Sequence, residues 1–230
     1  RPETVFGAVN IWVNPSAVYV KACIDGKNWI LSKEAAYKLG FQLKKIEVIE
    51  EFKGEKLVGL RARNPATGWR VPVLPAVFVD PDTGTGVVMS VPAHAPYDYV
   101  ALKDIMKQKD FLLKLGIKPS ELQPIPVIEV PGRGNKLAVD VVESMKIDKQ
   151  TDREALDKAT KEVYSIEFKQ GIIVQEVVDR VYKLVDEGAD MISIGFEPMN
   201  PHPDLVYRVV RRVKEECDVP IALDSLIPSE

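Results

Sequence analysis

The stretch DPDTGTGVVMSVPAHAPYD, residues 80–98, carries the side chains best placed for chemistry on a small ligand. The two glycines of GTG at 84–86 allow a backbone turn to approach a ligand closely. A predicted strand at 86–91 then leads to a helix whose first turn holds Asp98. Such a strand-to-helix corner brings a carboxylate and several backbone groups together at one end of a sheet, where a small ligand can bind.

Each of these features also has a purely structural explanation. An acidic side chain in the first turn of a helix is favoured by the helix dipole by about 0.3–1 kcal/mol, which alone would account for Asp98. His94 has no Cys, Asp or second His at catalytic or metal-binding spacing, so we interpret it as a loop or turn histidine. Thr4, taken by itself, is an ordinary strand or turn residue.

Composition limits the class of protein. The 230 residues are 46% hydrophobic and 28% charged, which is enough apolar material for a packed core. Two cysteines and two histidines are too few for a disulfide framework, and we expect a reduced, cytosolic protein without a metal. We find neither an apolar run of about 20 residues nor a signal peptide, and thus expect no membrane contact. The net charge of -3 excludes a globally basic nucleic-acid binder.

Up to residue 172 the sequence consists mainly of short β-type runs separated by Pro and Gly. These runs are VYVKACI, NWILS, KIEVIE, VPVLPAVFV, GVVMSV and IPVIEV. Short strands with turn residues between them indicate an antiparallel or barrel-type fold. We therefore expect the α+β class, with a strand-rich, barrel-like domain and peripheral helices.

Helix start and stop signals agree in three places. Ser32 is placed to cap a helix that ends at Gly40, and Pro96 suits the first position of a helix that runs to about Gln108. Residues 151–162 form a third, highly charged helical stretch. Residues 119–131 contain too much proline for a helix, and PGRGN at 131–135 indicates an exposed turn.

The pattern changes after residue 172. Residues 173–230 hold 6 Lys/Arg and 12 Asp/Glu, whereas residues 1–172 have a net charge of +3. The spacing of the apolar residues there predicts a helix at 177–185, a strand in ADMISIG, a helix after Asp204 and a strand in VPIAL. This order is that of a parallel βαβ unit. We therefore expect two domains, residues 1–172 and residues 173–230.

Taken together, the motifs of residues 1–172 resemble the editing (CP1) domain of leucyl-tRNA synthetase in its archaeal and eukaryotic form. RPETVFGAVNIWVNP at 1–15 corresponds to the family's threonine-rich motif, and GTGVVMSVPAHAPYDY at 84–99 to its GTG and aspartate motifs. The resemblance implies a domain without a cofactor that hydrolyses tRNA carrying the wrong amino acid. Editing is needed because a hydrophobic pocket separates side chains that differ by one methylene by only about 1–3 kcal/mol.

The resemblance also implies roles for individual residues. Asp98 matches the aspartate that holds the substrate α-amino group, and Thr4 matches the threonine that keeps leucine from fitting. Arg1 stands at the family's arginine, while Met89 and Ser90 match the wall of the amino-acid pocket. The implied reaction is attack of water on the ester that links the amino acid to the terminal ribose, and the implied partners are the tRNA(Leu) 3′ end and the remaining synthetase domains.

The tail after residue 172 is similar to part of a dihydropteroate synthase-like, pterin-binding barrel. Asp224 matches a pterin-contacting aspartate and Glu197 the acid of a loop, whereas Ser193 replaces the usual acidic residue. Only two of that family's eight βα units are present, so a fusion or chimera would explain the tail.

Three functions therefore stay open at the level of sequence. The leading one is hydrolytic editing of misacylated tRNA(Leu) in the cytoplasm. The second is a non-catalytic module that binds aminoacyl-adenosine, because the family's threonines that precede RPET are not in this sequence. The third is a fragment of a pterin-dependent C1-transfer enzyme.

Overall fold

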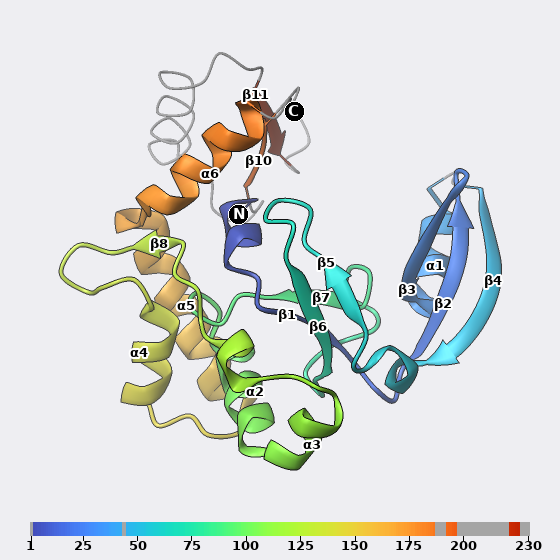
Figure 1. Cartoon of the computed structure of the whole chain (residues 1–230), viewed down its shortest axis with the longest axis horizontal. Coiled ribbons are helices and arrows are strands. Elements are labelled where there is room, and N and C mark those ends of the chain that lie inside the picture. Colours follow the sequence, from blue (N-terminus) through green and yellow to red (C-terminus); the bar gives the residue numbers. More distant parts are fainter. Residues whose placement is uncertain (1, 43–44, 187–191, 197–220, 226–230) are drawn as a thin grey trace.

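The computed structural model describes residues 2–42, 45–186, 192–196 and 221–225 (Figure 1). These residues form a mixed α+β structure, so the predicted fold class is confirmed. The strands are divided among several small sheets, and the described part of the chain contains no closed barrel. None of the helices in that part is long and apolar enough to cross a membrane.

A four-stranded sheet lies at the centre, in the order β5-β6-β1-β7. Its strands are β1 (Asn10–Val13), β5 (Arg61–Arg63), β6 (Arg70–Pro75) and β7 (Val87–Ser90). Strand β1 runs parallel to β6 and antiparallel to β7, so Trp12 stands between Leu74 and Val88. Trp12 and Leu74 are fully buried and form part of the main hydrophobic core.

A second, three-stranded sheet with one helix projects from the main body and is called the hairpin lobe here. It consists of β2 (Val18–Ile24), β3 (Lys27–Ser32), β4 (Ile46–Lys53) and α1 (Lys33–Gly40). Asp25 and Gly26 both have positive φ, 47° and 82°, as a two-residue hairpin turn requires. The predicted helix cap is confirmed, because the Ser32 hydroxyl accepts a hydrogen bond from the Ala35 amide.

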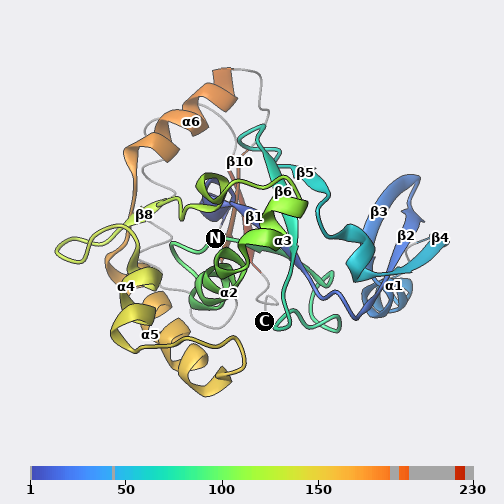
Figure 2. The ribbon, with the colours of Figure 1, turned by 60° about the horizontal axis from the view of Figure 1, so that its bottom comes forward.

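Four helices cover the other side of the central sheet, and Figures 1 and 2 both place them away from the hairpin lobe. They are α2 (Pro96–Lys107), α3 (Lys109–Lys114), α4 (Leu137–Ser144) and α5 (Arg153–Gln170). Helix α2 begins at Pro96 as predicted, and its buried Leu102 and Ile105 pack in the core of Trp12. Helix α5 begins two residues later and ends eight residues later than predicted, while α3 and α4 were not predicted.

Short elements complete the main body. They are the 3-10 helices η1 (Pro2–Gly7), η2 (Gly54–Leu57) and η3 (Pro119–Leu122) and the strand pair β8 (Ile128–Glu129) and β9 (Ile172–Ile173). The prolines of residues 119–131 do prevent an α-helix, because that stretch holds only η3 and β8. Residues 131–135 are exposed turn, as predicted.

The tail contains α6 (Gln175–Asp186), β10 (Ile192–Phe196) and β11 (Ile221–Ser225). Strands β10 and β11 pair in parallel, which confirms the two predicted strands and their direction. The predicted helix after Asp204 and the acid Glu197 lie outside the described residues. Strand β9 pairs with β8 across the predicted domain boundary, and Val177 of α6 is buried against Val127 and Ile128.

Candidate functional site

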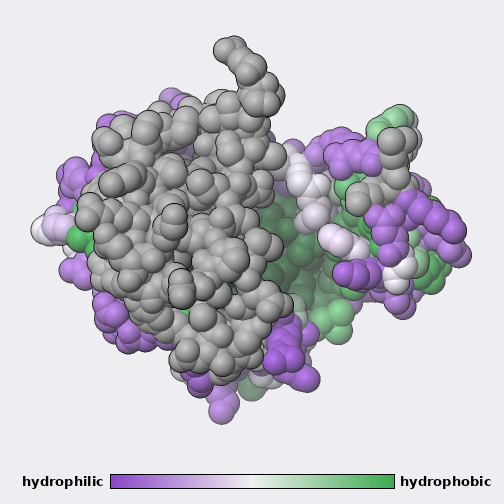
Figure 3. Space-filling view, turned by 90° about the horizontal axis from the view of Figure 1, so that it is seen from above, coloured by the Kyte–Doolittle hydropathy of each residue, from purple (hydrophilic) through white to green (hydrophobic). Residues whose placement is uncertain are grey.

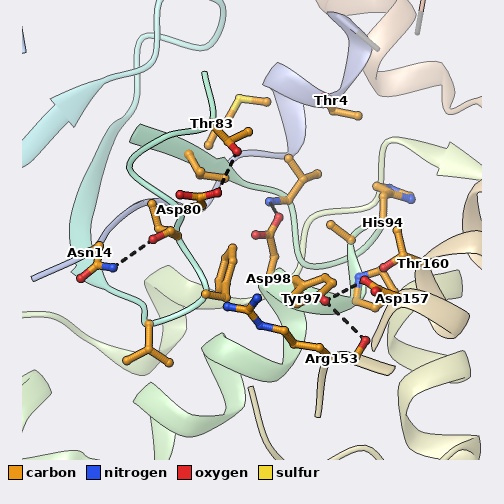
Figure 4. Close-up of a pocket in the computed structure, with 18 of the residues that line it drawn as sticks. Thr4, Asn14, Asp80, Thr83, His94, Tyr97, Asp98, Arg153, Asp157 and Thr160 are labelled. Carbon is orange, nitrogen blue, oxygen red and sulfur yellow. Dashed lines mark hydrogen bonds between the residues drawn. The ribbon is translucent and has the colours of Figure 1, made fainter. Parts of the chain in front are cut away.

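A cavity of about 980 Å³ opens where η1, β7, α2 and α5 meet (Figure 4). That volume suits a ligand of nucleoside size, since small-molecule sites commonly span about 300–1,000 Å³. Its polar lining residues come from five separate stretches of the chain, namely Thr4, Asn14, Asp80, Thr83, His94, Tyr97, Asp98, Arg153, Asp157, Thr160 and Tyr164. Val77, Phe78, Val88 and Met89 supply much of the apolar wall.

Asp98 lies at the base of this cavity and is only 5% exposed. The indole N–H of Trp12 donates a hydrogen bond of 3.0 Å to its Oδ1, and the amide of Val91 donates one of 2.7 Å to its Oδ2. Pro96 sets the start of α2, which brings Asp98 over the end of β7. These two donors fix the carboxylate while each oxygen keeps a lone pair for a ligand.

Burial raises the pKa of Asp98 from 3.8 to about 7, and the hydrogen bonds from Val91 and Trp12 oppose that rise. The carboxyl is therefore divided between its neutral and ionised forms near neutral pH. A cationic ligand group at this position would stabilise the ionised carboxylate and would bind it more strongly than the neutral carboxyl.

The helix dipole alone does not account for the contacts that Asp98 makes. The side chain occupies the first turn of α2, as the sequence indicates, but it also satisfies two donors that are buried with it. Removal of a buried acceptor costs about 1–3 kcal/mol, which exceeds the dipole contribution of an exposed acid. Asp98 therefore has a structural role that the helix dipole alone does not explain.

His94 lies in the turn between β7 and α2, which agrees with its interpretation as a turn residue. Its side chain is 1% exposed, and both ring nitrogens are engaged. Nε2 accepts a hydrogen bond of 2.9 Å from the Val127 amide, and Nδ1 lies 2.7 Å from Oε1 of Glu167. Because Nε2 is an acceptor, the proton is assigned to Nδ1, which donates to Glu167. The ring thus joins α5 to the main body, and neither nitrogen is available as a base.

The GTG turn contacts the hairpin lobe instead of the cavity. A side chain at Gly86, where φ is 69°, would meet Ser32 at 2.7 Å. The Ser32 amide donates to the Thr85 carbonyl at 2.8 Å, and the Tyr19 hydroxyl donates to the Gly86 carbonyl at 2.6 Å. The glycines do allow the backbone to approach another group closely, as predicted, but that group is the hairpin lobe and not a ligand.

Helix α5 contributes four lining residues that the sequence interpretation missed. They are Arg153, Asp157, Thr160 and Tyr164. Their spacing of four, three and four residues places them on one helix face, next to the face that carries the buried Leu156, Ala159 and Val163. The amphipathic pattern of residues 151–162 contained this signal, but it does not say what the polar face would meet.

The described residues contain no group of three His, Cys, Asp or Glu side chains that could hold a metal ion. Asp80, which shares the cavity, is held by its own turn: the Asp82 amide and the Thr83 hydroxyl donate to its two oxygens. These hydrogen bonds lower the pKa of Asp80.

Comparison with known proteins decides the family. The model of the family described as leucyl-tRNA synthetase, editing domain, matches residues 1–164. This chain belongs to that family. The predicted resemblance of the first part of the chain is thereby confirmed.

Curated relatives of this editing domain are archaeal leucine–tRNA ligases. The enzyme of Pyrococcus abyssi is 49% identical over 217 residues, and that of Methanocaldococcus jannaschii is 45% identical over 221 residues. The alignments cover 87% and 85% of this chain but 22% of each relative. The chain thus spans about a fifth of the length of these enzymes.

Solved structures give the same fold. The crystal structure of GlLeuRS-CP1 is 29% identical, has a TM-score of 0.65, and covers 81% of this chain and 78% of its own. The editing domain of the P. knowlesi cytosolic leucyl-tRNA synthetase is 20% identical and has a TM-score of 0.67. The match covers 81% of this chain and 77% of that domain.

The editing domain brings three of the five predicted site residues to the cavity. Asp98, Thr4 and Met89 line it, although 85 to 94 positions separate Thr4 from the other two. Ser90 is not among its lining residues: its side chain is fully buried, and Ser90 pairs with Asn10 of β1. The described residues give neither the Ser90 hydroxyl nor the Asn10 amide a hydrogen-bond partner. Arg1 lies outside the described residues.

Proposed function

We propose that this chain hydrolyses tRNA(Leu) charged with a noncognate amino acid. The observation that carries the proposal is the Asp98 carboxylate, oriented by Trp12 and Val91 at the base of a cavity of nucleoside size. In a member of this editing family, such a group suits the α-ammonium of an aminoacyl ester. The reaction is attack of water on the ester carbonyl, with the terminal ribose oxygen as leaving group.

Selection among amino acids rests on the cavity wall near Thr4 and Met89. Both residues line the cavity, and Thr4 belongs to η1, a separate element from the strand that carries Met89. A side chain branched at Cγ, such as leucine, would meet this wall, whereas a linear side chain such as norvaline or one branched at Cβ such as isoleucine would not. Discrimination of this kind amounts to about 1–3 kcal/mol per methylene.

Catalysis then depends on how the water molecule is positioned. The imidazole of His94 lines the cavity, but its two nitrogens bond to Glu167 and Val127. We therefore assign the rate enhancement to backbone groups and substrate hydroxyls that orient the water and stabilise the developing oxyanion.

The test is release of amino acid from norvalyl-tRNA(Leu) or isoleucyl-tRNA(Leu), compared with leucyl-tRNA(Leu). The wild-type chain should hydrolyse only the noncognate esters. Asp98→Asn should abolish hydrolysis, and Asp110→Asn, a change of an exposed acid on α3, should not. Thr4→Ala should make leucyl-tRNA(Leu) a substrate. A wild-type chain that binds a non-hydrolysable aminoacyl-adenosine but releases no amino acid would instead identify a binding module.

The partners we propose are the charged 3′ end of tRNA(Leu) and the remaining domains of a cytoplasmic leucine–tRNA ligase. The net charge of +3 in residues 1–172 fits recognition of the terminal nucleotide more than an extended RNA surface. The domain boundary at residue 172 also stays a proposal.

A pair of truncations tests that boundary. A chain that ends at residue 172 loses the pairing of Ile173 with Ile128 and the buried Val177 side chain. We expect it to retain hydrolysis but to unfold at lower denaturant than a chain that ends at residue 186, by about 1.5–3 kcal/mol for the lost valine burial. Failure of the shorter chain to fold would move the boundary beyond α6.

A further inference from the structure

Arg153 is the one Lys or Arg among the residues that line the described cavity. It is the first residue of α5, and its side chain extends from that helix into the cavity (Figure 4). Three carboxylates, those of Asp80, Asp98 and Asp157, line the same cavity. A single cation among three acids would normally be expected to pair with one of them.

Each of the three acids is instead held by another donor. Asp98 accepts from Trp12 and Val91, and Asp80 accepts from the turn that follows it. The Tyr97 hydroxyl donates a hydrogen bond of 2.8 Å to Oδ1 of Asp157. Within the described part of the chain, the Arg153 guanidinium makes neither a hydrogen bond nor an ion pair. The cation is therefore available to a ligand.

Arg153 reaches the cavity from the first residue of α5, whereas Asp98 belongs to the first turn of α2. The charge of Arg153 acts on two other lining residues. It lowers the pKa of Asp80 and opposes the rise in the pKa of Tyr97. The pKa of Asp98 is set by burial, Val91 and Trp12. The cavity thus offers an anionic group at one place and a cationic group at another.

An aminoacyl ester of a 3′-terminal nucleotide has the complementary pair of charges. Its amino acid carries an ammonium, and the phosphate that joins the nucleotide to the chain carries a negative charge. With the ammonium at Asp98, the phosphate requires a separate cation. Guanidinium is well suited to it because its planar N–H groups match two phosphate oxygens.

We infer that Arg153 binds the phosphate on the 5′ side of the terminal adenosine and so positions the ester in the cavity. This inference rests on the proposed editing function and adds a binding residue to it. The contact is made to the nucleotide, so it serves cognate and noncognate esters alike. Arg153 therefore contributes to affinity for the tRNA end, whereas the wall near Thr4 contributes to selection of the amino acid.

Two non-hydrolysable probes test the inference: a norvalyl-adenosine amide with a free 5′ hydroxyl, and the same compound with a 5′ phosphate. Calorimetric titration should show that the wild-type chain binds the phosphorylated probe about tenfold more tightly, the order expected for one charge-assisted contact. Arg153→Ala should bind both probes equally, with the hydroxyl probe bound as in the wild type. Arg153→Lys should keep part of the preference. Lys158→Ala, a change of an exposed cation on the same helix, should keep all of it.

Two results would overturn the inference while leaving the proposed function in place: a wild-type chain without preference for the phosphate, or an Arg153→Ala variant that retains the full preference. A wild-type chain that binds neither probe would overturn the proposed function itself. On tRNA, Arg153→Ala should raise KM, leave kcat unchanged, and reduce the slope of log affinity against log salt by about 0.7, the value for one single-strand phosphate.

Discussion

The cavity wall and the solvent-exposed surface of the hairpin lobe hold their polar groups in different ways. At the cavity, hydrogen bonds join residues 86 positions apart, Trp12 and Asp98, and 73 positions apart, His94 and Glu167. In the lobe, Lys33 bonds to Glu51, only 18 positions away. The side chains of His94 and Glu167 are each 1% exposed, whereas those of Lys33 and Glu51 are 55% and 48% exposed.

This difference matters because water competes with exposed partners and cannot reach buried ones. An exposed ion pair contributes about 0.2–1 kcal/mol, whereas removal of one member of a buried pair costs several kcal/mol. The lobe also leaves large apolar side chains in solvent, among them Trp29, Tyr37 and Phe41. Figure 3 shows a recessed hydrophobic surface between the lobe and the main body. Substitutions at the cavity wall should therefore affect stability far more than those on the exposed surface of the lobe.

The largest effect is expected for His94→Ala. This change removes the acceptor of the Val127 amide and takes one hydrogen-bond partner from the buried Glu167. The free energy of unfolding, measured with urea, should fall by about 3–5 kcal/mol. His94→Gln should recover part of the loss, since an amide oxygen can accept from Val127. A fall of less than about 1 kcal/mol in His94→Ala would show that this junction does not hold α5 in place.

The next effect concerns pH. Asp98 has a folded pKa of about 7, above the ordinary value of 3.8, so the folded state binds its proton more tightly than the unfolded state. The stability from Asp98 is therefore complete below about pH 4 and is lost as pH rises through about 7, by at most about 1.4 kcal/mol per pH unit.

The matched reference for this pH effect is Asp98→Asn, which cannot ionise. Relative to this variant, the wild type should lose unfolding free energy between pH 4 and 7 and then reach a plateau. Affinity for an aminoacyl-adenosine amide should change in the opposite sense and rise through pH 7, because the ammonium binds the ionised carboxylate. Parallel stability curves for wild type and variant would contradict the raised pKa.

A smaller effect is expected for Trp12→Phe. The smaller phenyl ring still fills most of the buried site, but the indole N–H that donates to Asp98 Oδ1 is lost. Unfolding free energy should fall by about 1.5–3 kcal/mol, as for a hydrogen bond to a charged group. Because that bond lowers the pKa of Asp98, the pH midpoint of ligand binding should move upward. An unchanged midpoint would mean that Trp12 does not tune the carboxyl.

The smallest effect is expected in the lobe. Lys33→Ala breaks the exposed ion pair with Glu51 and should lower the free energy of unfolding by less than about 1 kcal/mol. In 1 M salt, which screens the pair, the difference between wild type and variant should be smaller still. A loss comparable to that of His94→Ala would remove the distinction between the two regions.

The sequence by itself determined the local elements and the family. Ser32 and Pro96 mark where α1 and α2 begin, because capping and a preset φ act within one turn of the backbone. The β-branched runs between turn residues predicted the three strands of the hairpin lobe and β6 and β7 of the central sheet, but not β1 or β5. The RPET and GTG-to-Asp98 motifs carried the resemblance that the family model confirms.

Only the tertiary structure decided what these elements face. Nothing local in the chain shows that Asp98 meets Trp12, that His94 meets Glu167, or that Ser90 is buried without lining the cavity. The polar face of α5, with Arg153 at its start, is visible in the sequence as a stripe, but its place at the cavity depends on how α5 packs on α2 and α4. Such contacts follow from the packing of elements that lie tens of residues apart, where propensities that act over a few residues carry no information.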